Sequence, residues 1–223
     1  MINRRTLLVL VNAIYFKSDW ATKFDTSVAI KFQISHSSSI EVPMMRKTDT
    51  VFYARLDTLS SAMVELPYKG NRIVMQVLLP RTMFGLEDLE AKLKNVDIHE
   101  LFENKKRKME VKIRLPKFKL VSTLPLNENL KELGLKNLFT PGVADLSGIT
   151  GGKLYVSLVI QKALIEVDEE GTVAAAATGA VGGGNEMAGG PIMFTADHPF
   201  IFYLRDMESG ILLFQGRVIN PLK

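Results

Sequence analysis

The sequence has 223 residues, of which 47% are hydrophobic and 23% are charged, a composition typical of a globular chain that buries a core in one domain or two. The absence of cysteine excludes disulfide bonds, thiolate metal sites and a cysteine nucleophile. The net charge of +4 is small, no arginine-rich or aromatic-interleaved stretch indicates nucleic acid, and His36, His99 and His198 lack metal-ligand spacing, so we expect neither partner.

The N-terminal sequence MINRRTLLVLVNAIYF imitates a secretory signal peptide, because a basic start precedes an apolar run. We reject this interpretation. Asn12 interrupts the run, no small-residue cleavage site precedes Lys17 and Asp19, and the run is too short to span a bilayer. The segment instead resembles a buried central strand, and we expect no membrane association.

Strands are predicted throughout residues 24–80. The sequences KFQIS, VFYARL, SAMVELPY and RIVMQVLLP alternate or run apolar with β-branched residues, and turn clusters at 36–39 and 69–71 separate some of them. Leucines at 86, 89 and 93 then have helical spacing, and a second short helix is expected at 98–102.

The sequence MEVKIRLPKFKL alternates on both sides of Pro116, which predicts one or two strands with a kink. Leucines at 126, 130 and 133 have helical spacing, and Gly134 is the expected helix stop. Strands are predicted at 194–204 and 211–218. No enzyme site emerges, because the chain shows neither a nucleophile with a base motif nor paired carboxylates in a recognisable setting.

Residues 165–199 have the pattern of a long exposed loop that begins as a strand. Glu169 and Glu170 are expected in water, and Gly171 gives the backbone freedom at a hinge position. Residues 172–178 are small and uncharged, with four consecutive alanines. Composition alone favours a short helix, because alanine is the best helix former, and a strand is the alternative, because a sheet could accept these small side chains on either face.

Three sequences carry a resemblance to a known family: EEGTVAAAAT, FTADHPFIFYLRD and FQGRVINP. They resemble the hinge, reactive-centre loop and C-terminal signature of the serpins, the serine protease inhibitor superfamily. The resemblance implies an α+β serpin fold with several mostly antiparallel sheets and few helices. It covers all of 1–223 as one partial domain, N-terminally incomplete, with the reactive-centre loop at about 171–193 and roughly three fifths of a typical member's length.

In serpins a target protease cleaves the loop, and the hinge side then inserts as a new strand into the largest sheet. On this resemblance the alanine-rich run is a strand in waiting, because alternate small side chains on one face must slip between packed strands. The implied hinge comprises Glu169, Glu170, Gly171, Thr172, Val173, Ala174, Ala175, Ala176, Ala177 and Thr178.

The sequence VNAIYFKSDW matches the serpin segment that ends the third strand of the main sheet. The match implies a strand at 6–16, with Asn12 in the central shutter and Trp20 at the breach, where insertion begins. Trp20 is equally compatible with an ordinary core aromatic. In whole serpins a long, mostly helical portion precedes this segment.

The resemblance also makes residues 155–168 the fifth strand of the main sheet. Gln161 stands where the family usually has a shutter histidine, and it can share hydrogen bonds with Asn12 but cannot become charged. Lys117 is implied beside the breach, within reach of Glu169. The alternative is that Lys117 and Glu169 are two solvated charges, whose interaction contributes less than ~1 kcal/mol to stability.

Counting along the family pattern places the reactive bond fourteen residues after Gly171 and nine before Phe194, between Asn185 and Glu186. Common trypsin-like and chymotrypsin-like proteases do not prefer asparagine. The alternative bond, Met187–Ala188, suits a chymotrypsin- or elastase-like enzyme.

We therefore expect an inhibitor of serine proteases that acts by loop cleavage and insertion, and not an enzyme. A non-inhibitory serpin-fold carrier or chaperone is the alternative. We expect no cofactor, compromised inhibition by these 223 residues alone, and secretion of the full-length protein, with the cytoplasm as the alternative. The basic run Lys105, Lys106, Arg107 and Lys108 is most simply a solvated turn, and weak glycosaminoglycan binding is its alternative interpretation.

Overall fold

The structure is a computed structural model that describes residues 8–149, 151, 154–170 and 191–223. The described residues divide into two compact units: those within 1–16 and 119–166 form one unit, and those within 17–118 and 167–223 form the other.

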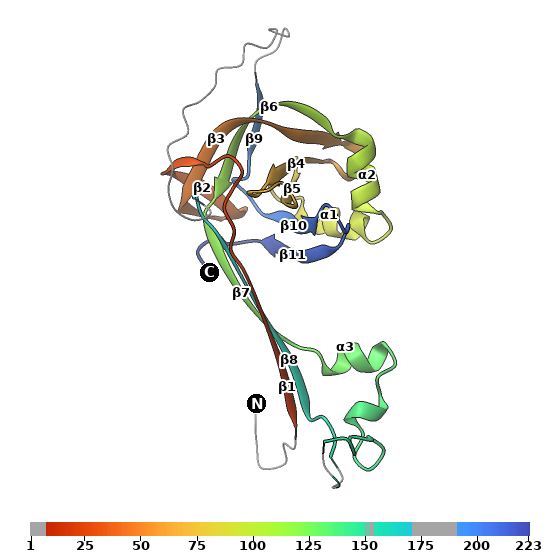
Figure 1. Cartoon of the computed structure of the whole chain (residues 1–223). Coiled ribbons are helices and arrows are strands. Elements are labelled where there is room, and N and C mark those ends of the chain that lie inside the picture. Colours follow the sequence, from red (N-terminus) through yellow and green to blue (C-terminus); the bar gives the residue numbers. More distant parts are fainter. Residues whose placement is uncertain (1–7, 150, 152–153, 171–190) are drawn as a thin grey trace. The chain divides into compact units, whose positions relative to one another are not determined.

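The first unit contains a three-stranded sheet in the order β1-β8-β7. Strand β1 (Val9–Phe16) pairs in parallel with β8 (Leu158–Val167), from Val9 opposite Leu158 to Phe16 opposite Ile165 (Figure 1). The strands predicted at 6–16 and 155–168 are therefore shorter, and residues 6 and 7 lie outside the described part. In the described chain Leu10 and Val11 are 43% and 63% exposed.

Strand β7 (Phe118–Pro125) completes this sheet and leads to helix α3 (Asn127–Glu132), which is followed by a 3₁₀ turn at Asn137–Phe139. The predicted stop is present, since Gly134 has a φ of +101° and ends the helical run in a left-handed conformation. Strand β6 (Arg107–Pro116) ends at Pro116, so the sequence MEVKIRLPKFKL forms two strands, which belong to different sheets.

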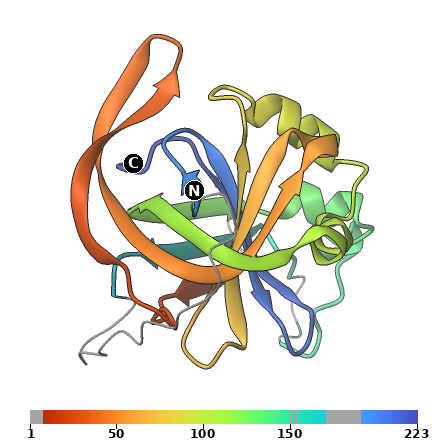
Figure 2. The same cartoon turned by 90° about the horizontal axis from the view of Figure 1, so that it is seen from above.

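The second unit is built on an eight-stranded sheet in the order β11-β10-β5-β4-β3-β6-β9, with β2 paired to β3. The bounds are β2 Asp25–Ser35, β3 Ser38–Leu56, β4 Ser61–Pro67, β5 Ile73–Pro80, β6 Arg107–Pro116, β9 Ile192–Thr195, β10 Phe200–Asp206 and β11 Leu212–Val218. The long strand β3 pairs in turn with β2, β6 and β4, and its curve between these partners is visible in Figure 2. The turn expected at 36–39 is narrower, because β3 begins at Ser38.

Helices α1 (Leu86–Leu93) and α2 (Ile98–Lys105) pack with a 3₁₀ turn (Asp57–Leu59) over one face of this sheet. Their apolar positions join strand residues in a core cluster that comprises Ala54, Leu56, Leu59, Met63, Leu78, Leu86, Leu89, Phe102, Ile201 and Tyr203. In the described part of the chain, no helix has the length and apolar character needed to cross a bilayer.

The prediction of one strand at 194–204 is wrong, because β9 ends at Thr195 and β10 begins at Phe200. Pro199 has no N–H to donate to a neighbouring strand. His198 is buried instead and contacts the Asp197 carboxylate and the Pro80 carbonyl oxygen, each at 2.8 Å. These contacts fix the bend between the two strands.

Candidate functional site: the end of strand β8

The candidate site lies where the chain leaves β8, at Asp168, Glu169 and Glu170, directly before residues 171–190. All of its side chains belong to the second unit. The site has two parts, an ion pair on Glu169 and an aromatic cluster around Trp20.

The Glu169 carboxylate accepts three hydrogen bonds. Lys117, which directly follows β6, places its Nζ 2.6 Å from Glu169 Oε2, and Ser27 of β2 donates both its hydroxyl and its N–H, the latter at 3.3 Å. The backbone is held as well, since the Phe24 N–H donates to the Glu169 carbonyl oxygen at 3.1 Å. The contact between Lys117 and Glu169 that the resemblance implied is therefore present.

Electrostatics favour the ionised form of Glu169. Burial alone would raise the pKa of this carboxyl, since its side chain is only 18% exposed, but the hydrogen bonds from Lys117 and Ser27 outweigh burial and lower the pKa to about 2. Glu169 is thus a carboxylate throughout the physiological pH range.

Trp20 is a buried ring that also holds the end of β8. Its indole N–H donates to the Asp168 carbonyl oxygen at 2.8 Å. The ring stacks on Tyr68 with centroids 4.2 Å apart and meets the edge of Phe24 at 5.5 Å. Trp20 is therefore both a core aromatic and a direct contact of the β8 end, and Lys17 adds an ion pair to the Asp168 carboxylate at 3.1 Å.

Sequence reasoning missed Ser27 and Lys47. The Lys47 ammonium is buried, donates to the Thr22 carbonyl oxygen at 2.9 Å, pairs with Asp49 at 3.2 Å and lies 4.7 Å from the Phe24 ring centre. Burial lowers the pKa of Lys47, and Asp49 partly offsets this effect. Through Thr22 and Phe24, Lys47 fixes the turn that carries Trp20.

The two residues that the resemblance assigns to the shutter lie in the first unit. Asn12 of β1 and Gln161 of β8 are register partners in the parallel pair. Side chains at paired positions lie on the same face of a sheet, which brings these two amides side by side.

The remaining predicted residues are placed as follows. Hinge positions 171–178 and both candidate reactive bonds, at 185–186 and 187–188, lie outside the described residues. Ile192 and Met193, assigned to the end of the loop, belong to β9. Lys106 of the basic run pairs with Glu103 at 2.7 Å and lies 4.4 Å from the Phe52 ring centre, so the run is not four equally free cations.

The contacts of Glu169 with Lys117 and Ser27, and of Asp168 with Trp20, form a non-covalent clasp on the segment directly before residues 171–190. It offers charge, hydrogen bonds and an aromatic stack, each of which can be broken and remade. Its chemistry therefore suits the holding and release of a strand end.

Comparison with known proteins gives a consistent result. The profile of a family described as Serpin (serine protease inhibitor) matches residues 1–221. The leukocyte elastase inhibitor of Homo sapiens is 38% identical over 229 residues, which cover 99% of this chain and 60% of that protein. Intracellular coagulation inhibitor 1 of Tachypleus tridentatus is 39% identical over 218 residues, covering 96% and 52%.

Among solved structures, a serpin from the trematode Schistosoma haematobium superposes with a TM-score of 0.85 at 30% identity. The match covers 99% of this chain and 59% of that one. The chain thus spans about half to three fifths of the length of the relatives that it matches.

Proposed function

Because the chain belongs to the serpin (serine protease inhibitor) family, and has that family's α+β fold, we propose that it inhibits a serine protease by offering residues 171–190 as bait. After cleavage, the hinge at 169–178 inserts as a strand between β1 and β8. The relatives that are inhibitors by name support protease inhibition in general, and the sheet of β1 and β8 supports the mechanism.

The observation that carries the proposal is the parallel pairing of β1 with β8 over eight positions, without a strand between them. The chain that leaves β8 and folds back would run antiparallel to both strands. Insertion would exchange one parallel ladder for two antiparallel ones, and antiparallel pairs are the more stable per residue. The sheet can therefore gain hydrogen bonds by accepting the hinge.

The clasp on Glu169 gives this transition a barrier. Insertion requires the chain after β8 to turn back, and the contacts of Glu169 with Lys117 and Ser27, like the Trp20 contact with Asp168, fix the point of that turn. We propose that they keep the uncleaved hinge out of the sheet.

Asn185–Glu186 is our proposed reactive bond, and Met187–Ala188 is the second candidate. Counting along the family pattern supports the first bond, and the preference of chymotrypsin- and elastase-like proteases for apolar residues supports the second.

Full-length protein here means the chain together with any residues encoded upstream of Met1. We propose that inhibition needs them and that these 223 residues alone inhibit poorly. The exposure of Leu10 and Val11 on β1 supports this proposal, because such a surface favours association or aggregation unless another segment covers it.

A non-inhibitory carrier or chaperone is the second candidate, and the small, uncharged residues 172–178 of the hinge favour inhibition over it. The comparisons lend no support to secretion, and the word "intracellular" in the name of the Tachypleus relative favours the alternative location. Glycosaminoglycan binding by the basic run is likewise without support from the comparisons.

The test is incubation of full-length protein with chymotrypsin, elastase and trypsin, followed by denaturing electrophoresis and mass spectrometry of the released C-terminal peptide. We expect a denaturant-resistant complex and a peptide that begins at Glu186. A peptide that begins at Ala188 would move the bond to the second candidate. Cleavage only before Gly179, or turnover without a complex, would contradict the mechanism.

A further inference from the structure

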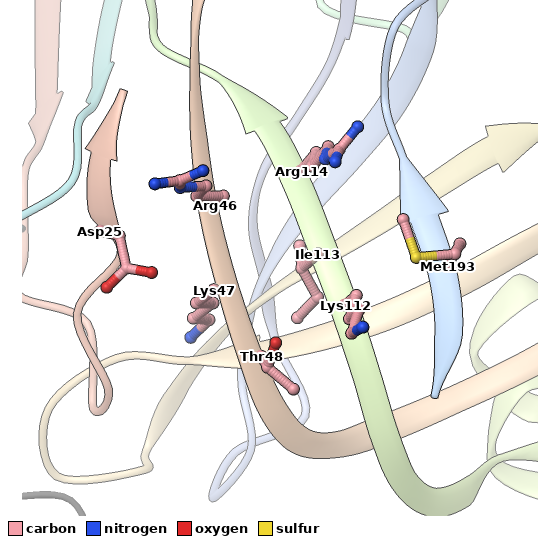
Figure 3. Close-up of a pocket in the computed structure, with 8 residues that line it drawn as sticks. All are labelled: Asp25, Arg46, Lys47, Thr48, Lys112, Ile113, Arg114 and Met193. Atoms are coloured by element: carbon pink, nitrogen blue, oxygen red, sulfur yellow. The ribbon is translucent and has the colours of Figure 1, made fainter. Parts of the chain in front are cut away.

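The exposed face of strands β3 and β6 carries a cavity of about 120 Å³ with a strongly basic lining. Arg46, Lys112 and Arg114 line it together with Thr48, Met193 and Asp25 (Figure 3). On β6 the alternation is regular, because Val111, Ile113 and Leu115 are buried whereas Lys112 and Arg114 are exposed. The cations therefore face solvent, while the opposite side of the strand packs in the core.

Two of the cations are placed against each other. Arg46 and Arg114 are direct register partners in the antiparallel β3–β6 pair, and Lys112 is two residues from Arg114 on the same face. Like charges at directly opposed positions destabilise a sheet. This repulsion therefore lowers the stability of the fold, and a bound anion would relieve it.

The surrounding residues leave this charge largely uncompensated. Within the described chain, Arg46, Lys112 and Arg114 form no ion pair. Asp25 is opposite Arg46 in the β2–β3 register and lines the cavity, which leaves three free cations against one carboxylate. Lys47 also contributes to the lining, but its ammonium is already engaged by Asp49 and Thr22.

The position of the cavity indicates its occupant. Strand β9, which follows residues 171–190, runs parallel to β6 and places Met193 beside Lys112. Met193 is only seven residues after Glu186, and seven residues span at most about 25 Å. A protease of about 220 residues has a radius of gyration of about 17 Å. A protease engaged at the proposed reactive bond is therefore within reach of this face.

We propose that the basic cavity is a second docking site, which binds acidic side chains on the surface of the target protease. This inference rests on the proposed function and adds a specificity determinant outside the loop. Complementary charge mainly accelerates association and makes it sensitive to salt. The site therefore favours proteases with an acidic rim around the active-site cleft.

The test compares full-length wild-type protein with a double variant, Arg46→Gln with Arg114→Gln. The matched control, Lys105→Gln with Arg107→Gln, also removes two exposed charges, one at the end of α2 and one at the start of β6. The probes are native chymotrypsin and chymotrypsin whose surface lysines have been succinylated to carboxylates. Association rate constants are measured at about 0.05 M and about 0.5 M NaCl.

We expect wild-type protein to associate with the succinylated enzyme roughly tenfold faster at low salt than at high salt. The cavity variant loses most of that gain and the control keeps it. Because the variant relieves repulsion between two arginines, its urea midpoint should not fall, which separates a docking defect from misfolding.

Equal rates for wild type and the cavity variant would overturn the inference while leaving the proposed function intact. If the control variant lost the same rate gain, the effect would be one of net charge alone, and the inference would also be overturned. Heparin retention that the cavity variant lacks, with unchanged association rates, would assign the face to a polysaccharide instead. Failure of wild type to form any denaturant-resistant complex would overturn the proposed function and, with it, this inference.

Discussion

Replacing Glu169 with glutamine removes the charge from the clasp at the end of β8 and changes little else. The amide oxygen of the variant can still accept hydrogen bonds from Ser27, but the ion pair with Lys117 is lost. We expect a destabilised protein whose defect depends on pH.

The magnitude follows from the Glu169 pKa, which is lowered from 4.5 to about 2 in the folded protein. That difference corresponds to about 3 kcal/mol at most, and solvent screening of the partly exposed pair reduces the expected loss to about 1–2 kcal/mol at pH 7. Because the folded pKa is the lower one, this stabilisation is fully present above pH 4.5 and is lost as the pH falls toward 2.

The assay is urea unfolding of full-length protein, followed by circular dichroism at pH 7 and at about pH 3. The wild type and Glu169→Gln should differ at pH 7, and the difference should be smaller at the lower pH. Glu110→Gln is the matched control, because Glu110 is exposed on β6 and forms no ion pair within the described residues. A defect of equal size at both pH values would refute the electrostatic explanation.

Two further substitutions test the packing. Trp20→Phe removes the donor to the Asp168 carbonyl oxygen and part of the ring stack. Calorimetry should show a free energy of unfolding lower by about 2 kcal/mol, and an unchanged melting temperature would disprove the contribution of these contacts. Gly216→Ala would place a methyl group 2.7 Å from the buried ring of Phe202. This clash should lower the free energy of unfolding, measured by chemical denaturation, by about 1–3 kcal/mol. Gly148→Ala, with open space at the methyl position, is the control, and equal losses in both would contradict the packing argument.

The spacing of apolar residues predicted most helices and strands, because apolar side chains recur along the face of an element that is buried. The leucines of α1 and the alternation on both sides of Pro116 are examples, and the structure contains α1, β6 and β7 at these places. The prediction of one strand at 194–204 was wrong because it ran through Asp197, His198 and Pro199, although two polar residues and a proline without an N–H interrupt the apolar pattern there.

The clasp could be predicted only in part. Lys117 and Glu169 are 52 residues apart, and the family resemblance, not their spacing, brought them together. Ser27 gave no signal, since an alternating strand indicates a face and not a partner from a distant segment. Lys47 did give a signal in the sequence, because Asp49 is two residues further along the same strand and therefore lies on the same face.

The most direct test of the central claim, inhibition through hinge insertion, is Thr172→Arg in the full-length protein, with Thr172→Val as the control of similar size. A buried, unpaired charge should cost several kcal/mol against insertion, and each 1.4 kcal/mol is about a tenfold change. We predict that the arginine variant is cleaved by the protease as a substrate, without a denaturant-resistant complex, while the valine variant still traps the enzyme. An arginine variant that forms the complex as fast as wild type would contradict insertion as the mechanism.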